Sequence, residues 1–521
     1  MPHSRIGSID PAFQMKAPVA APGLLLLHAS ASGKSTANVL LVGTIFLVAS
    51  LLVILGSFTT KSSGSSSSSV EFVMPVTQSC EKSSPSSSMS KNFVPAEAID
   101  PIPALEEQGT GIHSNVRHLH PIGVAAHTFV LTGGYRTEKR SFAVVGLASK
   151  PLHVFGKPEF SCEWVPTTSA SQPTSDSPSS SSIFGRAKRI LPDWGYGRVY
   201  TVVVVHCYFK SSVGENGSGG RLILHAGEKG SATPASKITA LVEAPGSYSP
   251  SQFLPKYDYL YCGSSLFGDI NPQRLREWIA YHAWLFGPRS HFVLHDVGGA
   301  RSKGVRSVLE PWIRSGRVTV QDFREQARFD GYYYNQFLVV NDCLFRYKHA
   351  ANWTFFFDVD EYVNVPGPST LDSVLDELGQ NYSQIMFEQN LMGHNVCVNS
   401  NRTDRSRQWG FEKLVFINVQ KSVRLDRKYV LRAPLADSAG VHLSENVRGK
   451  SLYSRGQISY FHFHNTITEH QENCREFVKV PKNRTSKVWL NKIPYLYDDK
   501  LSTLADEVKQ FELQTIGPVT L

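Results

Sequence analysis

The sequence predicts an α/β domain with a mostly parallel central sheet, an all-β domain before it, and one transmembrane helix near the N-terminus. Three observations support this: strands and helices alternate after Pro250, short β-rich runs fill residues 111–243, and residues 39–57 are almost wholly apolar. Alternation of strand and helix is typical of a parallel sheet flanked by helices, and short runs without helical period are typical of a β-sandwich. A chain of 521 residues is long enough for two domains and non-globular segments.

Residues 39–57 have the length and composition of a membrane anchor. At about 1.5 Å per residue they make roughly 27 Å of helix, close to the thickness of a bilayer core. More Lys and Arg residues precede this segment than follow it closely, so the positive-inside rule predicts a cytosolic tail over 1–38 and a lumenal remainder. A removed signal peptide or a buried core helix is the alternative.

The residues that follow indicate the lumen of the secretory pathway. Residues 58–105 are dense in serine and read as a flexible stalk, which gives the plan of a type II Golgi membrane protein. All seven cysteines lie beyond the anchor, where disulfides are permitted, and the odd count leaves at least one free or paired between chains. Five Asn-x-Ser/Thr sequons predict glycosylation, at Asn216, Asn352, Asn381, Asn401 and Asn483.

The charge of the chain favours acidic partners. The formal net charge is +9 and the isoelectric point is near 9.0, which suits an anionic membrane or an acidic polysaccharide. No Lys/Arg run interleaved with aromatic residues is present, so we expect no nucleic-acid partner.

Residues 106–248 are predicted to form the all-β domain. Its β-rich runs are separated by Gly and Ser, and the serine tract over 167–182 is expected to be a long loop. Four aromatic residues of this part could either stack on sugars or fill the core of the sandwich: Trp164, Trp194, Tyr196 and Tyr200.

Residues 249–521 are predicted to form the α/β domain. The first strand, 257–262, is followed by a turn at Gly263-Ser264-Ser265, and Asn271 caps a helix that has Pro272 at its first position. The predicted order then continues with a strand over 291–294, a helix over 305–313, a strand over 318–320, a helix over 333–350 and a strand over 355–357.

Two aspartates at the end of the last of these strands predict a metal site. Side chains alternate along a strand, so Asp358 and Asp360 are expected to point the same way and to need a cation between them. Carboxylates suit Mg²⁺ or Mn²⁺, which also bind phosphate oxygens. A parallel sheet would bring Asp296 to the same crevice. The alternative is an acidic strand end that turns into solvent.

The sequence resembles glycosyltransferase family 92, on Asn341-Asp342-Cys343 and on residues 355–362, which read Phe-Phe-Phe-Asp-Val-Asp-Glu-Tyr. The resemblance implies a GT-A fold, a UDP-galactose donor, Mn²⁺ (or Mg²⁺) dependence and inversion at the sugar carbon. It further implies a β-1,4-galactan acceptor, as in the side chains of pectic rhamnogalacturonan I, and a carbohydrate-binding role for the β domain. A homodimer is also expected.

The resemblance also implies roles for individual residues. Asp358 and Asp360 would hold the metal together with His462, with His464 in reserve, and Glu361 would brace the site. The backbone of Cys262-Gly263-Ser264 would pass close to the nucleotide. Asp296 would bind uracil or ribose, or would instead cap a helix.

The acceptor side is less defined by the sequence. An inverting transfer needs a base, for which the candidates are Asp437, Glu388 and Glu445, and Gly393-His394-Asn395 is predicted to line the acceptor groove. Three alternatives stay open: a noncatalytic carbohydrate-binding scaffold, a metal-dependent phosphohydrolase or nucleotidyltransferase, and a transferase with a different donor sugar.

Overall fold

The computed structural model describes residues 115–123, 127–149, 158–167, 182–197, 199–228, 230, 234–399, 408–421 and 425–521. All of them belong to one compact unit, Ala96–Leu521. The predicted tail, anchor and stalk (1–38, 39–57 and 58–105) and the serine tract over 168–181 lie outside the described residues. No helix in the described part of the chain is long and apolar enough to cross a membrane.

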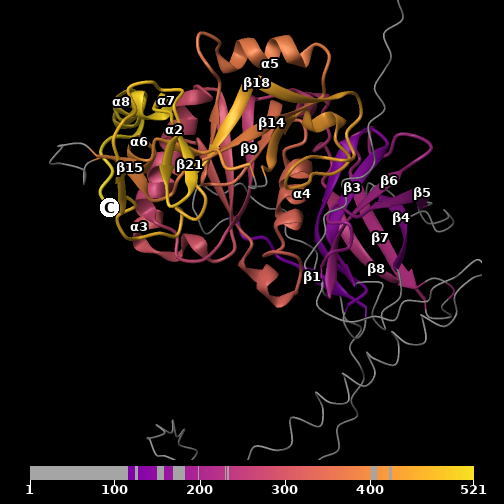
Figure 1. Ribbon diagram of the computed structural model, residues 1–521. Coiled ribbons are helices and arrows are strands. Elements are labelled where there is room, and N and C mark those ends of the chain that lie inside the picture. The colour runs from indigo at the N-terminus through magenta and orange to yellow at the C-terminus, as the bar shows by residue number, and fades with distance from the viewer. Residues whose placement is uncertain are drawn as a thin grey trace, which may run out of the picture. The chain divides into compact units, whose positions relative to one another are not determined.

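The first sheet has eight antiparallel strands in the order β1-β2-β3-β6-β5-β4-β7-β8 (Figure 1). β5 pairs with β4 through its first half and with β6 through its second half, and β2 contacts β8 at the far end of the order. The sheet therefore curls around its own core instead of forming the two separate sheets of the predicted sandwich. The strands are β1 (His120–Ile122), β2 (Phe129–Glu138), β3 (Ser141–Ser149), β4 (Pro158–Pro166), β5 (Ile183–Ile190), β6 (Tyr200–Tyr208), β7 (Gly220–Glu228) and β8 (Ser236–Glu243).

Strands β3 and β6 are buried on both faces. Phe142 and Val144 of β3 pack into the core of the first sheet, whereas Ala143 and Val145 pack into a second core shared with the rest of the chain. Because both faces of β3 are covered, its sequence is a continuous apolar run and does not alternate between apolar and polar residues. Of the four aromatic residues considered in this part, Trp164 and Tyr200 are buried, whereas Trp194 and Tyr196 are exposed.

The second sheet also has eight strands, in the order β11-β10-β9-β12-β17-β14-β18-β13. The first four are mutually parallel, as the sequence predicts; β17 is antiparallel to β12 and β14, and β13 is antiparallel to β18. The strands are β9 (Tyr257–Leu266), β10 (Ser290–Asp296), β11 (Val318–Asp322), β12 (Ala351–Phe356), β13 (Glu361–Asn364), β14 (Gln384–Leu391), β17 (Arg427–Leu431) and β18 (Ser451–His462).

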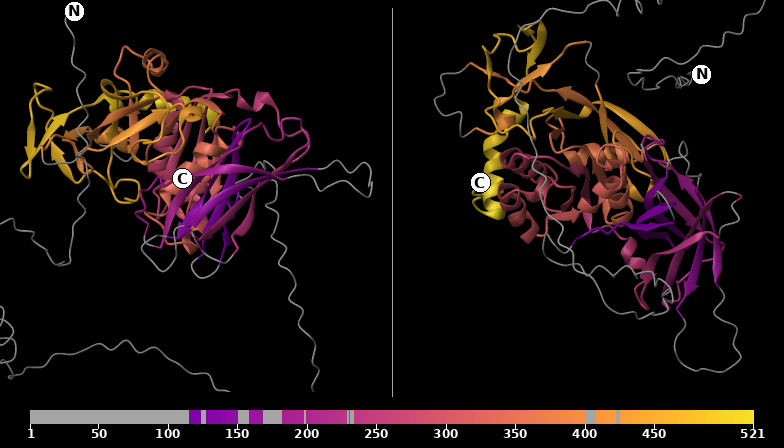
Figure 2. Two further views of the ribbon diagram at one scale, coloured as in Figure 1. Left: turned by 90° about the vertical axis from the view of Figure 1, so that its right-hand side faces the viewer. Right: turned by 90° about the horizontal axis from the view of Figure 1, so that it is seen from below.

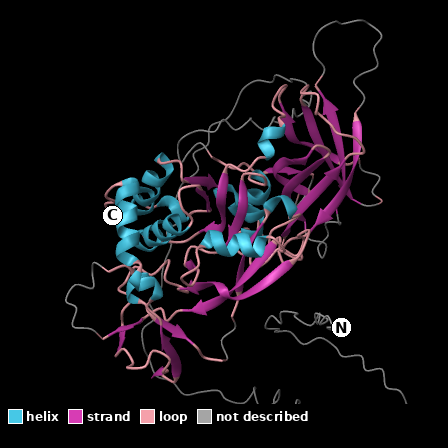
Figure 3. Cartoon of the chain, turned by 90° about the horizontal axis from the view of Figure 1, so that it is seen from above, coloured by secondary structure: helices cyan, strands magenta, loops and turns pink. Residues whose placement is uncertain are grey.

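Helices cover both faces of the second sheet. One face carries α2 (Pro272–Leu285), α3 (Lys303–Arg314) and α8 (Ala505–Ile516), which are grouped together in Figure 3. The other carries α4 (Gln336–Arg346), which lies between β9 and strands β2, β3 and β6 of the first sheet. Two smaller sheets, β15-β19 and β16-β21-β20, lie among the orange and yellow segments of Figure 2.

The remaining elements are shorter. They are α5 (Leu371–Gly379), β15 (Val396–Val398), α6 (Gly410–Lys413), β16 (Phe416–Asn418), β19 (Glu476–Val478), β20 (Val488–Leu490), β21 (Ile493–Tyr497), α7 (Lys500–Thr503) and the 3₁₀ turns η2 (Pro250–Phe253), η3 (Gly299–Arg301), η4 (Arg324–Arg328) and η6 (Ala433–Leu435).

The predicted fold class is wrong. Across the described residues strands predominate over helices and most strand pairs are antiparallel, so the chain is not a mostly parallel α/β protein of the GT-A type with a sandwich before it. The alternation of strand and helix extends only to β12. Beyond it, β17 and β13 join the sheet antiparallel to their neighbours, whereas β14 and β18 are parallel to each other.

Three disulfides lie among the described residues: Cys162–Cys207, Cys262–Cys343 and Cys397–Cys474. The second joins β9 to α4. These pairs account for six of the seven cysteines, and Cys80 lies outside the described residues.

A buried polar cluster joins the first sheet to α4. Asp342 of α4 accepts hydrogen bonds from Arg117 Nη2 (3.2 Å), from the Tyr135 hydroxyl of β2 and, more weakly, from Arg346 Nε (3.4 Å). Burial would raise the pKa of Asp342, but the two guanidinium groups hold it below its usual value. The carboxylate is therefore charged in the folded protein.

Candidate active site

Asp358 and Asp360 lie in a turn between β12 and β13, which we call the aspartate turn. Asp358 and Asp360 are therefore not on one face of a strand, and each contacts different partners. The turn is held by the backbone N–H of Asp358, which donates to Glu361 Oε2 (2.7 Å), and by the Asp360 carbonyl, which accepts from Phe463 N (2.9 Å). Glu361 braces the turn, as the sequence predicts.

Asp358 forms a buried ion pair. Its carboxylate accepts hydrogen bonds from Ser264 Oγ at the end of β9 and from Lys428 Nζ of β17 (2.7 Å). Burial would raise the pKa of Asp358, but Lys428 and Ser264 lower it to about 2. The negative charge of Asp358 is thus balanced by a cation that belongs to the protein.

Lys428 serves two carboxylates. Its ammonium group is also 3.5 Å from Glu361 Oε2, and both side chains are nearly inaccessible to solvent. Burial lowers the pKa of Lys428, but the charges of Asp358 and Glu361 raise it well above its usual value. Glu361 is less well compensated, so burial raises its pKa to about 7.

Asp360 and His462 adjoin Asp358, Glu361 and Lys428, and we call these five residues the aspartate cluster. His462 lies opposite Glu361 in the pairing of β13 with β18, with Nε2 3.6 Å from Asp360 Oδ2. Gln389 Nε2 of β14 lies 2.8 Å from His462 Nδ1. Burial would lower the pKa of His462, but Asp360 and Glu361 raise it to about 9. His464, the reserve ligand, is exposed, with its ring centroid 5.1 Å from that of His462.

The cluster fits a divalent cation that takes only part of its ligands from the protein. No group of three or more His, Cys, Asp or Glu side chains in the described residues is arranged to hold a metal ion. Asp360 and His462 do offer an adjacent oxygen and nitrogen, and Mg²⁺ and Mn²⁺ commonly take their other ligands from phosphates and water. The ring of Tyr460 lies next to that of His462, with centroids 6.2 Å apart, and its hydroxyl is buried without a hydrogen-bond partner among the described residues.

The residues predicted for the nucleotide are divided between this cluster and the protein interior. Cys262 is buried and disulfide-bonded, and the Gly263 carbonyl accepts from His295 Nδ1 (2.9 Å). The turn predicted at Gly263-Ser264-Ser265 is wrong, because β9 continues to Leu266. Of this segment, Ser264 alone contacts the cluster through a described side-chain hydrogen bond.

Asp296 ends β10, as predicted, and caps the turn that follows. Its Oδ1 accepts from the backbone N–H groups of Gly298 (2.8 Å) and Ala300 (3.0 Å). This geometry matches the alternative that the sequence left open, a capping aspartate. Arg324 Nε also lies 3.9 Å from Asp296 Oδ2.

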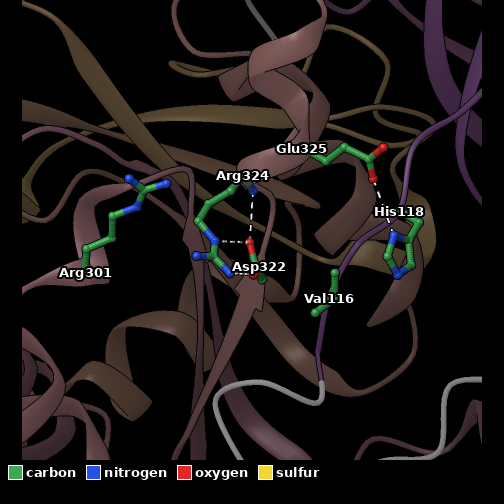
Figure 4. A pocket seen from close by; sticks show the side chains of 6 residues that line it. All are labelled: Val116, His118, Arg301, Asp322, Arg324 and Glu325. Atoms are coloured by element: carbon green, nitrogen blue, oxygen red, sulfur yellow. Dashed lines mark hydrogen bonds and ion pairs between the residues drawn. The ribbon is translucent and has the colours of Figure 1, made fainter.

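A cavity of about 380 Å³ opens near Asp296, at the ends of β10 and β11 (Figure 4). Within it Arg324 forms an ion pair with Asp322, and His118 lies 3.4 Å from Glu325. Because β10 and β11 are parallel neighbours of β9 and β12, this cavity and the aspartate turn lie at the same edge of the sheet. The lining residues are Val116, His118, Arg301, Asp322, Arg324 and Glu325.

The three carboxylates predicted as bases do not join the cluster through any described hydrogen bond or ion pair. The Asp437 carbonyl hydrogen-bonds His206 of the first sheet (2.7 Å), and Glu445 accepts from Trp194 Nε1 (2.8 Å). Glu388 precedes Gln389 on β14; because Gln389 faces His462, strand alternation turns Glu388 to the opposite face.

The predicted acceptor segment lies beside the cluster. Gly393 N donates to the Phe416 carbonyl (2.7 Å), and the Asn395 carbonyl accepts from Arg475 and Glu476. His394 is exposed, and the N–H of Met392, two residues earlier, donates to the His462 carbonyl (2.9 Å). Of the five sequons, Asn216, Asn352, Asn381 and Asn483 are exposed and Asn401 lies outside the described residues. Their glycosylation stays a prediction.

Sequence reasoning missed Lys428, Gln389 and Tyr460. Lys428 follows Arg427 at the charged start of β17, and nothing in this run indicates that Lys428 is buried. Gln389 and Tyr460 carried no signal either, because their role depends on which strands become neighbours.

Replacing Lys428 by Met is expected to lower the free energy of unfolding by about 3–5 kcal/mol, because the buried Glu361 and the partly exposed Asp358 would lose their cation. Lys428→Arg, which keeps the charge, should lose less. Denaturant unfolding measures both, with the exposed Lys450→Met as the control. Wild-type stability in Lys428→Met would show that the ion pair does not hold the cluster together.

The sequence of the chain is similar to a known protein family and to proteins of known activity. The model of the family described as Glycosyltransferase family 92 matches residues 257–499. The galactan beta-1,4-galactosyltransferase GALS1 of Arabidopsis thaliana is 52% identical over 407 residues, which cover 77% of this chain and 79% of that protein. The galactan beta-1,4-galactosyltransferase GALS3 of the same plant is 47% identical over 406 residues, covering 76% and 77%.

Proposed function

The chain belongs to glycosyltransferase family 92 and is a glycosyltransferase, and on this premise we propose that it transfers galactose from UDP-galactose to the 4-hydroxyl of β-1,4-galactan, with inversion. The observation that carries the proposal is the 52% identity to a galactan beta-1,4-galactosyltransferase across 79% of that protein. The acceptor would be the galactan side chains of pectin. In this proposal the aspartate cluster binds the diphosphate of UDP-galactose, and the segment that contains the exposed His394 binds the galactan.

We assign the leaving-group side of the reaction to Asp360 and His462. These two side chains would hold Mn²⁺, or Mg²⁺ in its place, which when bound neutralises charge on the departing diphosphate. Lys428 and Ser264 occupy both oxygens of Asp358. Asp358 therefore orders the turn that presents Asp360, and each of its oxygens keeps a further lone pair with which it would bind the metal beside Asp360.

We place the acceptor hydroxyl among the exposed residues that adjoin His462 and His464. Inversion requires a base that takes the proton of the attacking hydroxyl. We assign this role to none of the three predicted carboxylates, since Glu445 accepts from Trp194, Glu388 lies on the opposite face of β14, and no described hydrogen bond or ion pair joins the Asp437 carboxylate to the cluster.

We also propose that the enzyme works on the lumenal side of the Golgi membrane, anchored as a single-pass type II protein. Three disulfides support an oxidising compartment, because such bonds are rare in the cytosol. Exposure of four sequons is compatible with glycosylation there. The homodimer stays a prediction.

The full chain, incubated with Mn²⁺, UDP-galactose and a labelled short β-1,4-galactan, is expected to produce a ladder of elongated chains. UDP-arabinose and UDP-glucose serve as donor controls, and chelation of the metal should stop the reaction. Release of UDP without elongation, or no reaction, would contradict the proposal.

A further inference from the structure

Exposed aromatic side chains gather where the first sheet meets the segment before α4. Trp194 and Tyr196 follow β5, and Tyr332, Tyr333 and Tyr334 precede α4. All five are between 45% and 56% exposed. A concentration of exposed aromatic side chains on one surface is typical of a binding site.

The rings form a continuous series across the boundary between the two sheets. Ring centroids are 5.9 Å apart from Trp194 to Tyr196, 6.2 Å from Tyr196 to Tyr332 and 6.3 Å from Tyr332 to Tyr333. Tyr334 extends the series and stacks on Phe267 at 4.2 Å. We call the series from Trp194 to Tyr334 the aromatic track.

The backbone beneath the track is held in an unusual conformation. Tyr333, Tyr334 and Asn335 have φ values of 45°, 54° and 53°, and Trp194 has 52°. Residues with a β-carbon rarely adopt this left-handed region, and such strain is concentrated at functional sites. It also explains why the helix predicted from Tyr333 begins only at Gln336.

Buried polar side chains fix both ends of the track. Asp193, fully buried, accepts from Gly195 N and Val202 N, each at 3.1 Å, next to Trp194. Asn335, also buried, donates from Nδ2 to Gln326 Oε1 (2.8 Å) and to the Phe329 carbonyl (2.9 Å). The rings are therefore presented by an ordered backbone.

One end of the track reaches the aspartate turn. Two consecutive residues of β9 make the link: Ser264 donates to Asp358, and Ser265 Oγ donates to the Tyr334 carbonyl (3.1 Å). The opposite end is fixed by the hydrogen bond from Trp194 Nε1 to Glu445.

We propose that the aromatic track binds the galactan chain that is being extended, and so guides it from the first sheet to the aspartate turn. An aromatic ring offers an apolar face to the C–H groups of a sugar, and a tyrosine hydroxyl or indole N–H offers a polar edge to its hydroxyl groups. Galactan is neutral, and so are all five side chains. This inference rests on the proposed function, which supplies the nature of the polymer.

The track makes a specific prediction about acceptor length. A short acceptor reaches only the rings near the aspartate turn, whereas a long one also covers Tyr196 and Trp194. Tyr196→Ala should therefore lower the ratio of kcat/KM for a long over a short galactan oligosaccharide, and Tyr332→Ala should lower it as well. Loss of one stacked ring is expected to change this ratio and the affinity for the long oligosaccharide by about tenfold.

The experiment uses the full chain and two readouts. Transfer rates are measured with short and long β-1,4-galactan oligosaccharides, and binding of the long one is measured by calorimetry without UDP-galactose. Phe184→Ala and Trp489→Ala are the controls, because both rings are more than 60% exposed and belong to β5 and β20, outside the track. Tyr196→Phe and Tyr332→Phe keep the rings and should restore binding if the alanine variants lose it.

Each outcome decides the proposal. Unchanged length dependence and unchanged binding in both alanine variants would overturn it, as would a loss equal to that of the controls. A change in association state by light scattering without a change in galactan binding would show that the track meets a second copy of the chain. If the wild type transfers no galactose but loses galactan binding on mutation, the proposed function fails and the track stands.

Discussion

Asp360→Asn and His462→Ala are each expected to reduce galactosyl transfer by about 10²–10³-fold or more, even at saturating Mn²⁺. The two side chains lie 3.6 Å apart and provide the oxygen and nitrogen donors next to the aspartate turn. Losing either would leave the charge that develops on the departing diphosphate without its stabilisation. Initial rates with UDP-galactose and a short galactan measure the effect, and Mn²⁺ binding, followed by electron paramagnetic resonance, should weaken in parallel.

A second His–Asp pair of the chain provides the control. His470 Nε2 lies 3.1 Å from Asp269 Oδ2, and both side chains are exposed. His470→Ala and Asp269→Asn should keep the rate and the Mn²⁺ affinity of the wild type. Full activity of Asp360→Asn or of His462→Ala would remove that residue from the metal site.

The sequence predicted the proximity of Asp360 and His462 better than it predicted the acceptor side. Asp360 and His462 are over 100 positions apart, and the resemblance to the family brought them together correctly. Their neighbour Lys428 was not predicted, because its position depends on β17 pairing with β12. The carboxylates proposed as bases were chosen by residue type and by their place at a strand end or in a loop, neither of which reveals the face to which a side chain turns.

The same limit explains the error in the fold. Local signals placed α2 correctly: Asn271 accepts from the N–H groups of Gln273 and Arg274, and Pro272 begins the helix. Alternation of strand and helix also gave the order from β9 to β12. The antiparallel additions are long-range, since β13 pairs with β18 about a hundred residues later, and no periodicity in either strand encodes its partner.

Replacing Asp342 by Asn is expected to lower the free energy of unfolding at pH 7 by about 3–5 kcal/mol. Asp342 is completely buried in α4 and pairs with Arg117 and Arg346, so its neutralisation would remove the charged partner that both guanidinium groups share in the interior. Denaturant unfolding measures the loss. The exposed pair of Asp258 and Arg289, 2.9 Å apart, is the control, and Asp258→Asn should cost less than about 1 kcal/mol.

The pH dependence of this loss identifies its cause. The folded-state pKa of Asp342 lies below its usual value, so its charge contributes stability that is fully present above the unfolded-state pKa of about 4 and is lost as the pH falls through the folded-state pKa. The difference between the wild type and Asp342→Asn should therefore be largest at neutral pH and should shrink in acid. If the wild type and Asp342→Asn differ in unfolding free energy by the same amount at neutral and at acid pH, Asp342 joins the two sheets by packing and neutral hydrogen bonds. Its charge would then not be what stabilises their contact.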